Sequence, residues 1–236
     1  MAPAVPDYFL SDVHLRLDEP GRGQRLARLV DRLGRGDSLT IVGDLCDFWF
    51  AARQRRADPM SCAGLRSLAG FRDRGGPITI LAGNHDAWLG PFYEQTLGAR
   101  FLPDGLDPVV QGLRLRVVHG HRLGARTAWK AGMESRAFLA AFRSLPSPLA
   151  NFLGDQLKRT NEQHQEEFDR RGLEVFRRYV AGLPADALDL VILGHVHRPL
   201  DTAPGRPRLV VLGGWRDGSC HLVIDDGSAR HVVEPG

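Results

Sequence analysis

The sequence predicts an α/β fold, arranged as a sandwich of two β-sheets flanked by helices and carrying an inserted helical cap. Three observations support this prediction. Short apolar runs that end in polar clusters recur along the chain, helical patterns separate the early runs, and one helix-rich stretch has no strand pattern. The 236 residues, of which 43% are hydrophobic and 25% charged, suit one folded core. We expect that core to comprise residues 1–124 and 183–236, with residues 125–182 as the cap.

Five short apolar runs predict buried strands. Each is β-branched or leucine-rich and stops at a turn-forming residue, which is typical of strands covered on both faces. The runs cover residues 8–10, 39–42, 78–82, 113–118 and 190–193. Parallel strands carry their functional sites at their carboxyl ends, so the polar residues that follow these runs are the candidates for a site.

Helical patterns lie between the early strands. Apolar residues recur at helical spacing over 26–33 and 65–71, and glycines follow both patterns as stop signals. Three further apolar runs near the C-terminus have no helix between them and predict short strands at residues 209–212, 221–224 and 231–233.

The predicted cap differs from the rest of the chain. It is rich in helical patterns, Pro146 and Pro148 interrupt it, and it has no strand pattern. Residues 122–182 hold eleven Lys and Arg against seven Asp and Glu, although the whole chain has a net charge of only +3. A basic segment on a nearly neutral body favours an anionic substrate or surface, and a solvated helical face is the alternative.

Composition also limits the partners and the compartment. The net charge of +3 is too small to indicate a nucleic-acid partner. No apolar run approaches the ~20 residues of a membrane span, and acidic residues interrupt the N-terminal apolar stretch. The three cysteines are widely spaced, as expected of reduced thiols. We therefore expect a cytoplasmic protein, and the sequence leaves its oligomeric state open.

The polar clusters after the five strands contain metal-ligand residue types. Six of the nine histidines lie in these clusters, so ordinary capping or hydrogen-bonding roles do not account for the set. Carboxylate, imidazole and amide oxygen suit Mn²⁺, Fe²⁺ and Zn²⁺. Two metal ions would polarise a phosphoryl group and lower the pKa of a bound water. The predicted ligands are Asp12, His14, Asp44, Asn84, His119, His195 and His197.

In their order along the chain these clusters resemble the calcineurin-like metallophosphoesterases. The motifs are Asp-x-His, Gly-Asp-x-x-Asp, Gly-Asn-His-Asp, His-Gly-His and Gly-His-x-His, and they extend from residue 10 to residue 197. The resemblance implies a sandwich of two mixed β-sheets. It also implies a cofactor of two divalent metal ions, which are usually Mn²⁺ in the branch of the family that this sequence resembles.

The resemblance assigns a role to each position that matches a motif. One ion would be held by Asp12, His14, Asp44 and His197, and the other by Asp44, Asn84, His119 and His195, with Asp44 bridging. His85 matches the general acid for the leaving oxygen, and Asp86 would orient it. Asp47 and His121 match hydrogen-bond partners of the ligands rather than ligands.

The flanks of three motifs resemble one branch of this family, the UDP-2,3-diacylglucosamine diphosphatases. They are Phe-Leu-Ser-Asp-Val-His-Leu, Gly-Asp-Leu-Cys-Asp-Phe-Trp-Phe and Gly-Asn-His-Asp-Ala-Trp-Leu-Gly. This resemblance implies hydrolysis of UDP-2,3-diacylglucosamine to UMP and 2,3-diacylglucosamine 1-phosphate in lipid A synthesis. It implies contact with the cytoplasmic face of the inner membrane and a lipid-embracing cap. The candidates for substrate contact in the cap are Trp129, Phe138, Phe142, Lys158 and Arg159.

Two alternatives remain open at this stage. Several members of the branch have arginine at the position of His85 and aspartate at that of His121, which favours a phosphodiesterase or nucleotide pyrophosphatase with a soluble substrate. A non-catalytic scaffold of the same fold is the second alternative. The complete ligand set, together with His85, favours an enzyme.

Overall fold

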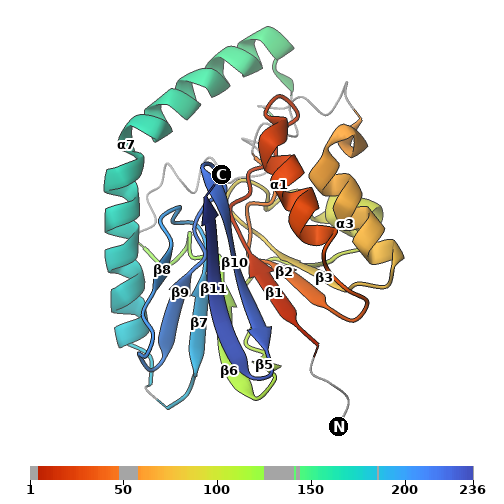
Figure 1. The fold of residues 1–236 in the computed structure, drawn as a ribbon. Coiled ribbons are helices and arrows are strands. Elements are labelled where there is room, and N and C mark those ends of the chain that lie inside the picture. The colour runs from red at the N-terminus through yellow and green to blue at the C-terminus, as the bar shows by residue number, and fades with distance from the viewer. Residues whose placement is uncertain (1–4, 48–57, 125–140, 142–143, 185, 236) are drawn as a thin grey trace.

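The computed structural model describes residues 5–47, 58–124, 141, 144–184 and 186–235, and for residues 147–148 and 150–164 it describes the backbone alone. Two mixed sheets pack against each other and helices flank them (Figure 1). The predicted fold class is therefore confirmed.

The first sheet has six strands in the order β11-β10-β1-β2-β3-β4. The strands β1 to β4 are parallel neighbours, whereas β10 pairs antiparallel with both β1 and β11. The parallel strands are β1 Asp7–Leu10, β2 Ser38–Ile41, β3 Ile78–Leu81 and β4 Arg100–Leu102, and the C-terminal pair is β10 Gly218–Asp225 and β11 Ser228–Pro235.

The second sheet has five strands in the order β5-β6-β7-β9-β8. Its three central strands are parallel, and the short strands β5 and β8 pair antiparallel at its two edges. The central strands are β6 Leu113–Val118, β7 Leu190–Leu193 and β9 Arg208–Val211, and the edges are β5 Val109–Val110 and β8 Leu200–Asp201.

Three apolar cores hold these layers together. Phe9, Val117 and Ile192 belong to the core between the two sheets. A second core packs α1 Pro20–Val30, α3 Ala63–Asp73 and α4 Gly90–Leu97 on the outer face of the first sheet, with a one-turn 3₁₀ helix at Pro59–Ser61. Burial on both faces explains the continuous apolar run of β7, whereas buried residues alternate with less buried ones along β2.

The long helix α7, Ser147–Ala181, covers the outer face of the second sheet. Leu173 and Phe176 pack on Val191 and Val211 there, while the first part of the helix extends beyond the upper end of the sheets (Figure 1). Pro146 and Pro148 lie at the N-cap and in the first turn, where a missing N–H costs nothing, so they start this helix rather than break it. Among the described residues, no helix has both the length and the hydropathy that a membrane span requires.

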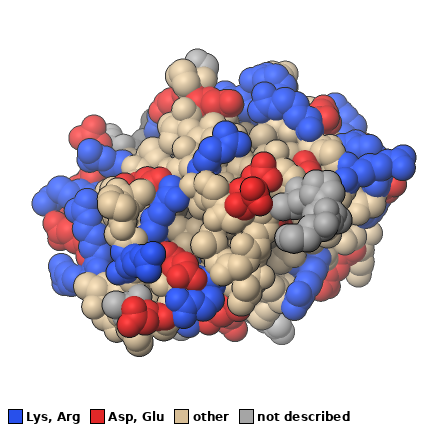
Figure 2. Space-filling view, turned by 60° about the horizontal axis from the view of Figure 1, so that its bottom comes forward, with Lys and Arg blue, Asp and Glu red and all other residues tan. Residues whose placement is uncertain are grey.

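Charges are interspersed on the face at the lower end of the sheets. Figure 2 shows basic and acidic side chains side by side there. Arg114 pairs with Asp189 at 3.0 Å, and Arg208 pairs with Asp201 at 2.6 Å. Exposed pairs of this kind add little to stability, but they leave no large single-sign area on the part of this face that the structure describes.

Candidate metal centre

Five strands end at one edge of the sandwich, and the loops after them carry all seven predicted ligands. The strands are β1, β2, β3, β6 and β7, each in parallel register with a neighbour from this group. Parallel strands bring their carboxyl ends to the same side. Six of these side chains form two groups with metal-ligand spacing, within which the ligand atoms lie within 4.8 Å of one another. His14, Asp47 and His85 form a third group with the same spacing.

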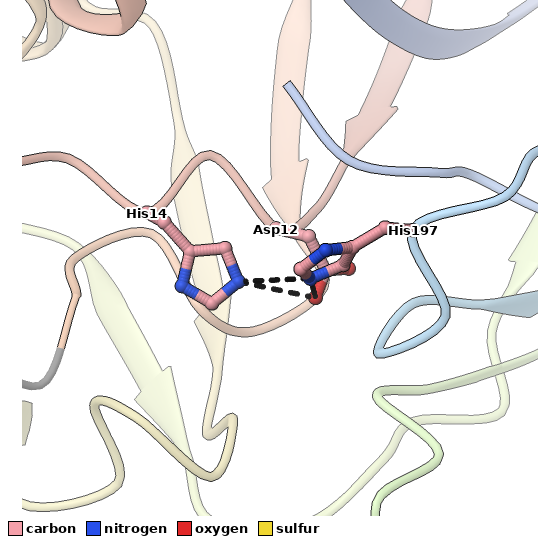
Figure 3. A group of neighbouring side chains, drawn as sticks. All are labelled: Asp12, His14 and His197. Atoms are coloured by element: carbon pink, nitrogen blue, oxygen red, sulfur yellow. Dashed lines mark hydrogen bonds and ion pairs between the residues drawn. The ribbon is translucent and has the colours of Figure 1, made fainter. Parts of the chain in front are cut away.

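The first group consists of Asp12, His14 and His197. Figure 3 shows the three side chains pointing toward one another from two different loops. His14 Nε2 lies 3.1 Å from His197 Nε2, and both nitrogens lie close to Asp12 Oδ1, at 3.8 and 3.7 Å. Two imidazole nitrogens and a carboxylate oxygen that converge in this way could share one cation.

The second group consists of Asp44, His119 and His195. His119 Nε2 lies 3.4 Å from Asp44 Oδ2 and 3.2 Å from the side-chain oxygen of Asn84. Asp44 Oδ2 is also 3.8 Å from His14 Nε2, which belongs to the first group. The Asp44 carboxylate therefore faces both groups, as a bridging ligand must.

The backbone is strained at four of these residues. Asp12, His14, Asp44 and His195 have φ angles of 53°, 49°, 53° and 65°. Residues other than glycine rarely adopt this left-handed backbone region. Such strain persists only where surrounding contacts hold the backbone in place. The loops supply those contacts, because Asp12 N donates to Gly43 O at 3.2 Å and His14 N donates to Asp44 O at 3.0 Å.

Two glycines let the loops approach closely. A Cβ on Gly83 would lie 1.9 Å from Asp44 Oδ1, and a Cβ on Gly43 would lie 2.5 Å from His119 Nδ1. Gly43 also has a φ of 82°. The glycines of the Gly-Asp and Gly-Asn motifs thus leave room for the ligands of neighbouring strands.

One ligand ring is fixed by a backbone carbonyl. His119 Nδ1 donates to Val42 O at 2.8 Å, which leaves Nε2 facing Asp44. A hydrogen bond of this kind to the far nitrogen sets the tautomer that a metal ligand needs.

The charges of the site fit a cation. Asp12 Oδ1 is buried and has no hydrogen-bond partner in the part of the chain that the structure describes. Burial raises the pKa of Asp12, and the neighbouring Asp44 adds to that rise. Burial also favours a neutral Asp44, but the charges on His119 and His85 outweigh it and hold the pKa of Asp44 well below its usual range. Two buried carboxylates need positive charge beside them, which divalent cations would supply.

Burial lowers the pKa of His14 well below its usual range, so its ring is neutral and offers a lone pair. Burial acts in the same direction on His119, but the charge and hydrogen bond of Asp44 prevail and raise the pKa of His119 to about 10. The two rings differ because the charges of His85 and His197 lower the pKa of His14 further, whereas Asp12 and the bond to Val42 O add to the rise of the pKa of His119.

His85 lies beside these groups, and its ring is held by Asp47. His85 Nδ1 is 3.1 Å from Asp47 Oδ1, and the backbone N–H of His85 donates to Asp44 Oδ1 at 2.9 Å. Burial lowers the pKa of His85, but Asp44 and Asp47 outweigh it and raise that pKa to about 9. Arg16 in turn donates to Asp47 Oδ2 at 3.1 Å.

Asp86, predicted to orient His85, has other hydrogen-bond partners in the structure. The buried Asp86 carboxylate accepts backbone N–H bonds from Gly83 at 3.0 Å and Leu45 at 2.8 Å, and the Tyr93 hydroxyl donates to it at 2.8 Å. Its oxygens thus accept backbone N–H bonds of the loop after β2. Asp86 shapes the backbone around Asp44, and Asp47 holds His85.

The His121 side chain lies near the ligand group, whereas the side chains of the candidates for substrate contact lie outside the described residues. The His121 ring lies 5.2 Å from that of His119, as a neighbour of the ligand group. Trp129, Phe138 and Phe142 lie outside the described residues, and so do the side chains of Lys158 and Arg159.

Sequence reasoning missed Asp169. This buried residue of α7 accepts the backbone N–H of His197 at 3.0 Å. Its sequence surroundings, Glu-Glu-Phe-Asp-Arg-Arg, are typical of an exposed helical face, so no local pattern could have indicated a role at the site.

Comparison with known proteins gives a consistent family. The sequence profile described as calcineurin-like phosphoesterase matches residues 8–199. Among solved structures, a protein of unknown function from Aquifex aeolicus aligns with a TM-score of 0.45 at 16% identity, covering 85% of this chain and 82% of its own.

Curated relatives align over nearly the whole chain. A protein named UDP-2,3-diacylglucosamine hydrolase from Nitrosococcus oceani is 28% identical, covering 91% of this chain and 89% of its own. Proteins of the same name from Aeromonas salmonicida and Xanthomonas campestris are each 30% identical over 94% of this chain, covering 91% and 96% of their own lengths.

Proposed function

Because the chain belongs to the calcineurin-like phosphoesterase family and is a metal-dependent phosphohydrolase, we propose that its substrate is UDP-2,3-diacylglucosamine. Water would cleave the diphosphate bond to give UMP and 2,3-diacylglucosamine 1-phosphate. The observation that carries this proposal is the similarity to curated relatives of that name at 28–30% identity over more than nine-tenths of the chain.

The two ligand groups are the proposed dimetal centre. One ion would be held by Asp12, His14, Asp44 and His197, and the other by Asp44, Asn84, His119 and His195. The unpartnered Asp12 oxygen and the position of Asp44 between the groups support this assignment. When bound, two divalent ions polarise a phosphoryl group and lower the pKa of a water. Mn²⁺ is the proposed ion, since carboxylate, imidazole and amide ligands suit it.

His85 is the proposed general acid for the leaving oxygen. Asp47 holds its Nδ1, so its Nε2 is the nitrogen available to the substrate. Because the backbone N–H of His85 is bonded to Asp44 Oδ1, the ring and the bridging carboxylate keep a fixed relation. Arg16 limits the movement of Asp47 and therefore of the ring.

The proposed substrate gives the predicted cap, residues 125–182, a role over the diacyl group, apart from the stretch of α7 around Leu173 and Phe176 that packs on the second sheet. The excess of basic residues over 122–182, eleven against seven acidic ones, would favour phosphates and an anionic membrane surface. We therefore include peripheral contact with the cytoplasmic face of the inner membrane in the proposal. Vesicle co-sedimentation with and without anionic lipid tests that part.

Hydrolysis of UDP-2,3-diacylglucosamine by Mn²⁺-loaded protein tests the proposal, with UDP-glucose as the soluble control. We expect UMP and the lipid phosphate as products of the lipid substrate, and little turnover of UDP-glucose. Equal turnover of both, or of the control alone, would assign the protein to the phosphodiesterases or pyrophosphatases of soluble nucleotides, which His85 favours. Absence of hydrolysis with any phosphoester would support the scaffold alternative.

A further inference from the structure

The loop that carries two of the proposed ligands, residues 194–197, is held by carboxylates from two separate parts of the chain. The backbone N–H of His195 donates to Asp12 Oδ2 at 2.8 Å. The backbone N–H of His197 donates to Asp169 Oδ1 at 3.0 Å. Asp12 comes from the loop after β1, whereas Asp169 comes from α7 on the outer face of the second sheet.

Asp169 is fixed in its own helix. Asp169 is only 7% exposed. The oxygen that accepts the His197 N–H, Oδ1, also accepts a hydrogen bond from Gln165 Nε2 at 2.9 Å, one helical turn earlier. A buried carboxylate that accepts two N–H bonds is held firmly, because losing either bond would leave a buried charge less well satisfied.

The helix packs tightly on the same loop. A Cβ on Gly172 would lie 2.5 Å from Val196 Cγ2, so α7 approaches the loop as closely as a glycine permits. The Phe168 ring meets the His195 ring edge-on, with 5.2 Å between ring centroids. Residues 168, 169 and 172 lie on one helical face, and all three contact this loop.

We propose that Asp169 is a positioning residue for the metal centre, acting through the backbone of His197. With its N–H fixed, His197 carries its Nε2 to 3.1 Å from that of His14 and 3.7 Å from Asp12 Oδ1. Without Asp169, the backbone N–H of His197 loses its acceptor. The backbone that positions the His197 ring beside His14 and Asp12 is then no longer fixed. This inference rests on the ligand role proposed above for His197.

Metal binding tests the proposal without any assay of turnover. Mn²⁺ binding to metal-free protein would be followed by calorimetry, and metal content would be measured after dialysis, for the wild type and four variants. We expect Asp169→Ala to weaken one of the two sites about 10- to 100-fold, the usual effect of losing a partner of a ligand. Asp169→Asn should retain most of the affinity, because its side-chain oxygen can still accept the His197 N–H. Arg171→Ala, at a side chain of α7 that is 71% exposed, is the matched control and should bind like the wild type.

The fourth variant, His197→Ala, separates the ligand role of His197 from the positioning role of Asp169. His197→Ala should lose one ion; if it kept both, the ligand assignment would be wrong. If His197→Ala lost an ion while Asp169→Ala bound Mn²⁺ like the wild type, the positioning role alone would be overturned. An Asn variant as weak as the Ala variant would also overturn it. Should Asp169→Ala fail to fold, Asp169→Glu, which shifts the oxygens by one methylene, decides by the same criterion.

Discussion

Four of the proposed ligands have left-handed backbone angles. Each of these residues must therefore both adopt an unfavourable backbone conformation and direct its side chain to the metal centre. Asp44, at a φ of 53°, must accept strain and also place its oxygens between two groups of histidines. Asparagine and aspartate tolerate this region better than other residues, since their short polar side chains bond locally. Few substitutions at these positions can satisfy both the backbone and the chemistry.

Replacing His85 with alanine tests the proposed acid. We expect kcat to fall by about 10²- to 10⁴-fold, the usual contribution of general acid catalysis, while metal content stays at about two ions per chain. The loss should be smaller for a substrate whose leaving group needs no proton. A variant that lost turnover equally for good and poor leaving groups would contradict the acid role.

Replacing Asp44 with alanine tests the bridge. Because this carboxylate faces both ligand groups, Asp44→Ala should lower the occupancy of both ions, and elemental analysis after dialysis measures this directly. Asn84→Ala is the matched comparison, since Asn84 adjoins the second group alone and should affect one ion. Equal metal loss in the His85→Ala and Asp44→Ala variants would contradict the separate roles proposed here.

At the scale of elements, the central parallel strands could be predicted from sequence and the two-residue edge strands could not. Apolar residues recur along β1, β2, β3, β6 and β7 because these strands contribute to the buried cores, and their ends therefore indicated where the ligands gather. The strands β5 and β8 have two residues each and no periodicity. The contact of Asp169 with His197 joins α7 to a loop 28 residues later, which no local pattern encodes.

The docking of α7 depends on Phe176. This ring is 1% exposed and packs so closely on Gly120 that a Cβ there would lie 2.7 Å from its Cζ. We expect Phe176→Ala to lower the free energy of unfolding by about 3–5 kcal/mol, measured by urea denaturation. Arg178→Ala, at a side chain that is 79% exposed on the same helix, should change it by less than ~0.5 kcal/mol. Similar values for the two variants would contradict the packing described here.

At the scale of the whole molecule, stability should depend on the pH through a histidine far from the metal centre. His221 on β10 is 5% exposed and its ring stacks on Tyr8, with 6.2 Å between ring centroids. Burial lowers its pKa from 6.5 to about 4. Between these pH values the unfolded chain binds a proton that the folded chain does not. The free energy of unfolding is therefore undiminished by His221 above pH 6.5, and it decreases as the pH falls from 6.5 toward 4.

We expect His221→Phe to remove about 3 kcal/mol of the stability loss that the wild type shows between neutral pH and pH 4. The measurement is the free energy of unfolding across this range for both proteins. Tyr8→Phe, which keeps the stacked ring, should leave the pH dependence unchanged. Parallel pH profiles for the wild type and His221→Phe would show that His221 titrates alike in both states.

The position of β1 has a consequence for synthesis on the ribosome. This strand lies between β2, which follows it within about 30 residues, and β10, which begins only at Gly218. The strand β1 therefore keeps one side open until β10 has been translated. An apolar strand with an unpaired edge is an attachment point for other chains. Nascent chains stalled before residue 218 should thus engage chaperones, and release of the C-terminal hairpin should end that dependence.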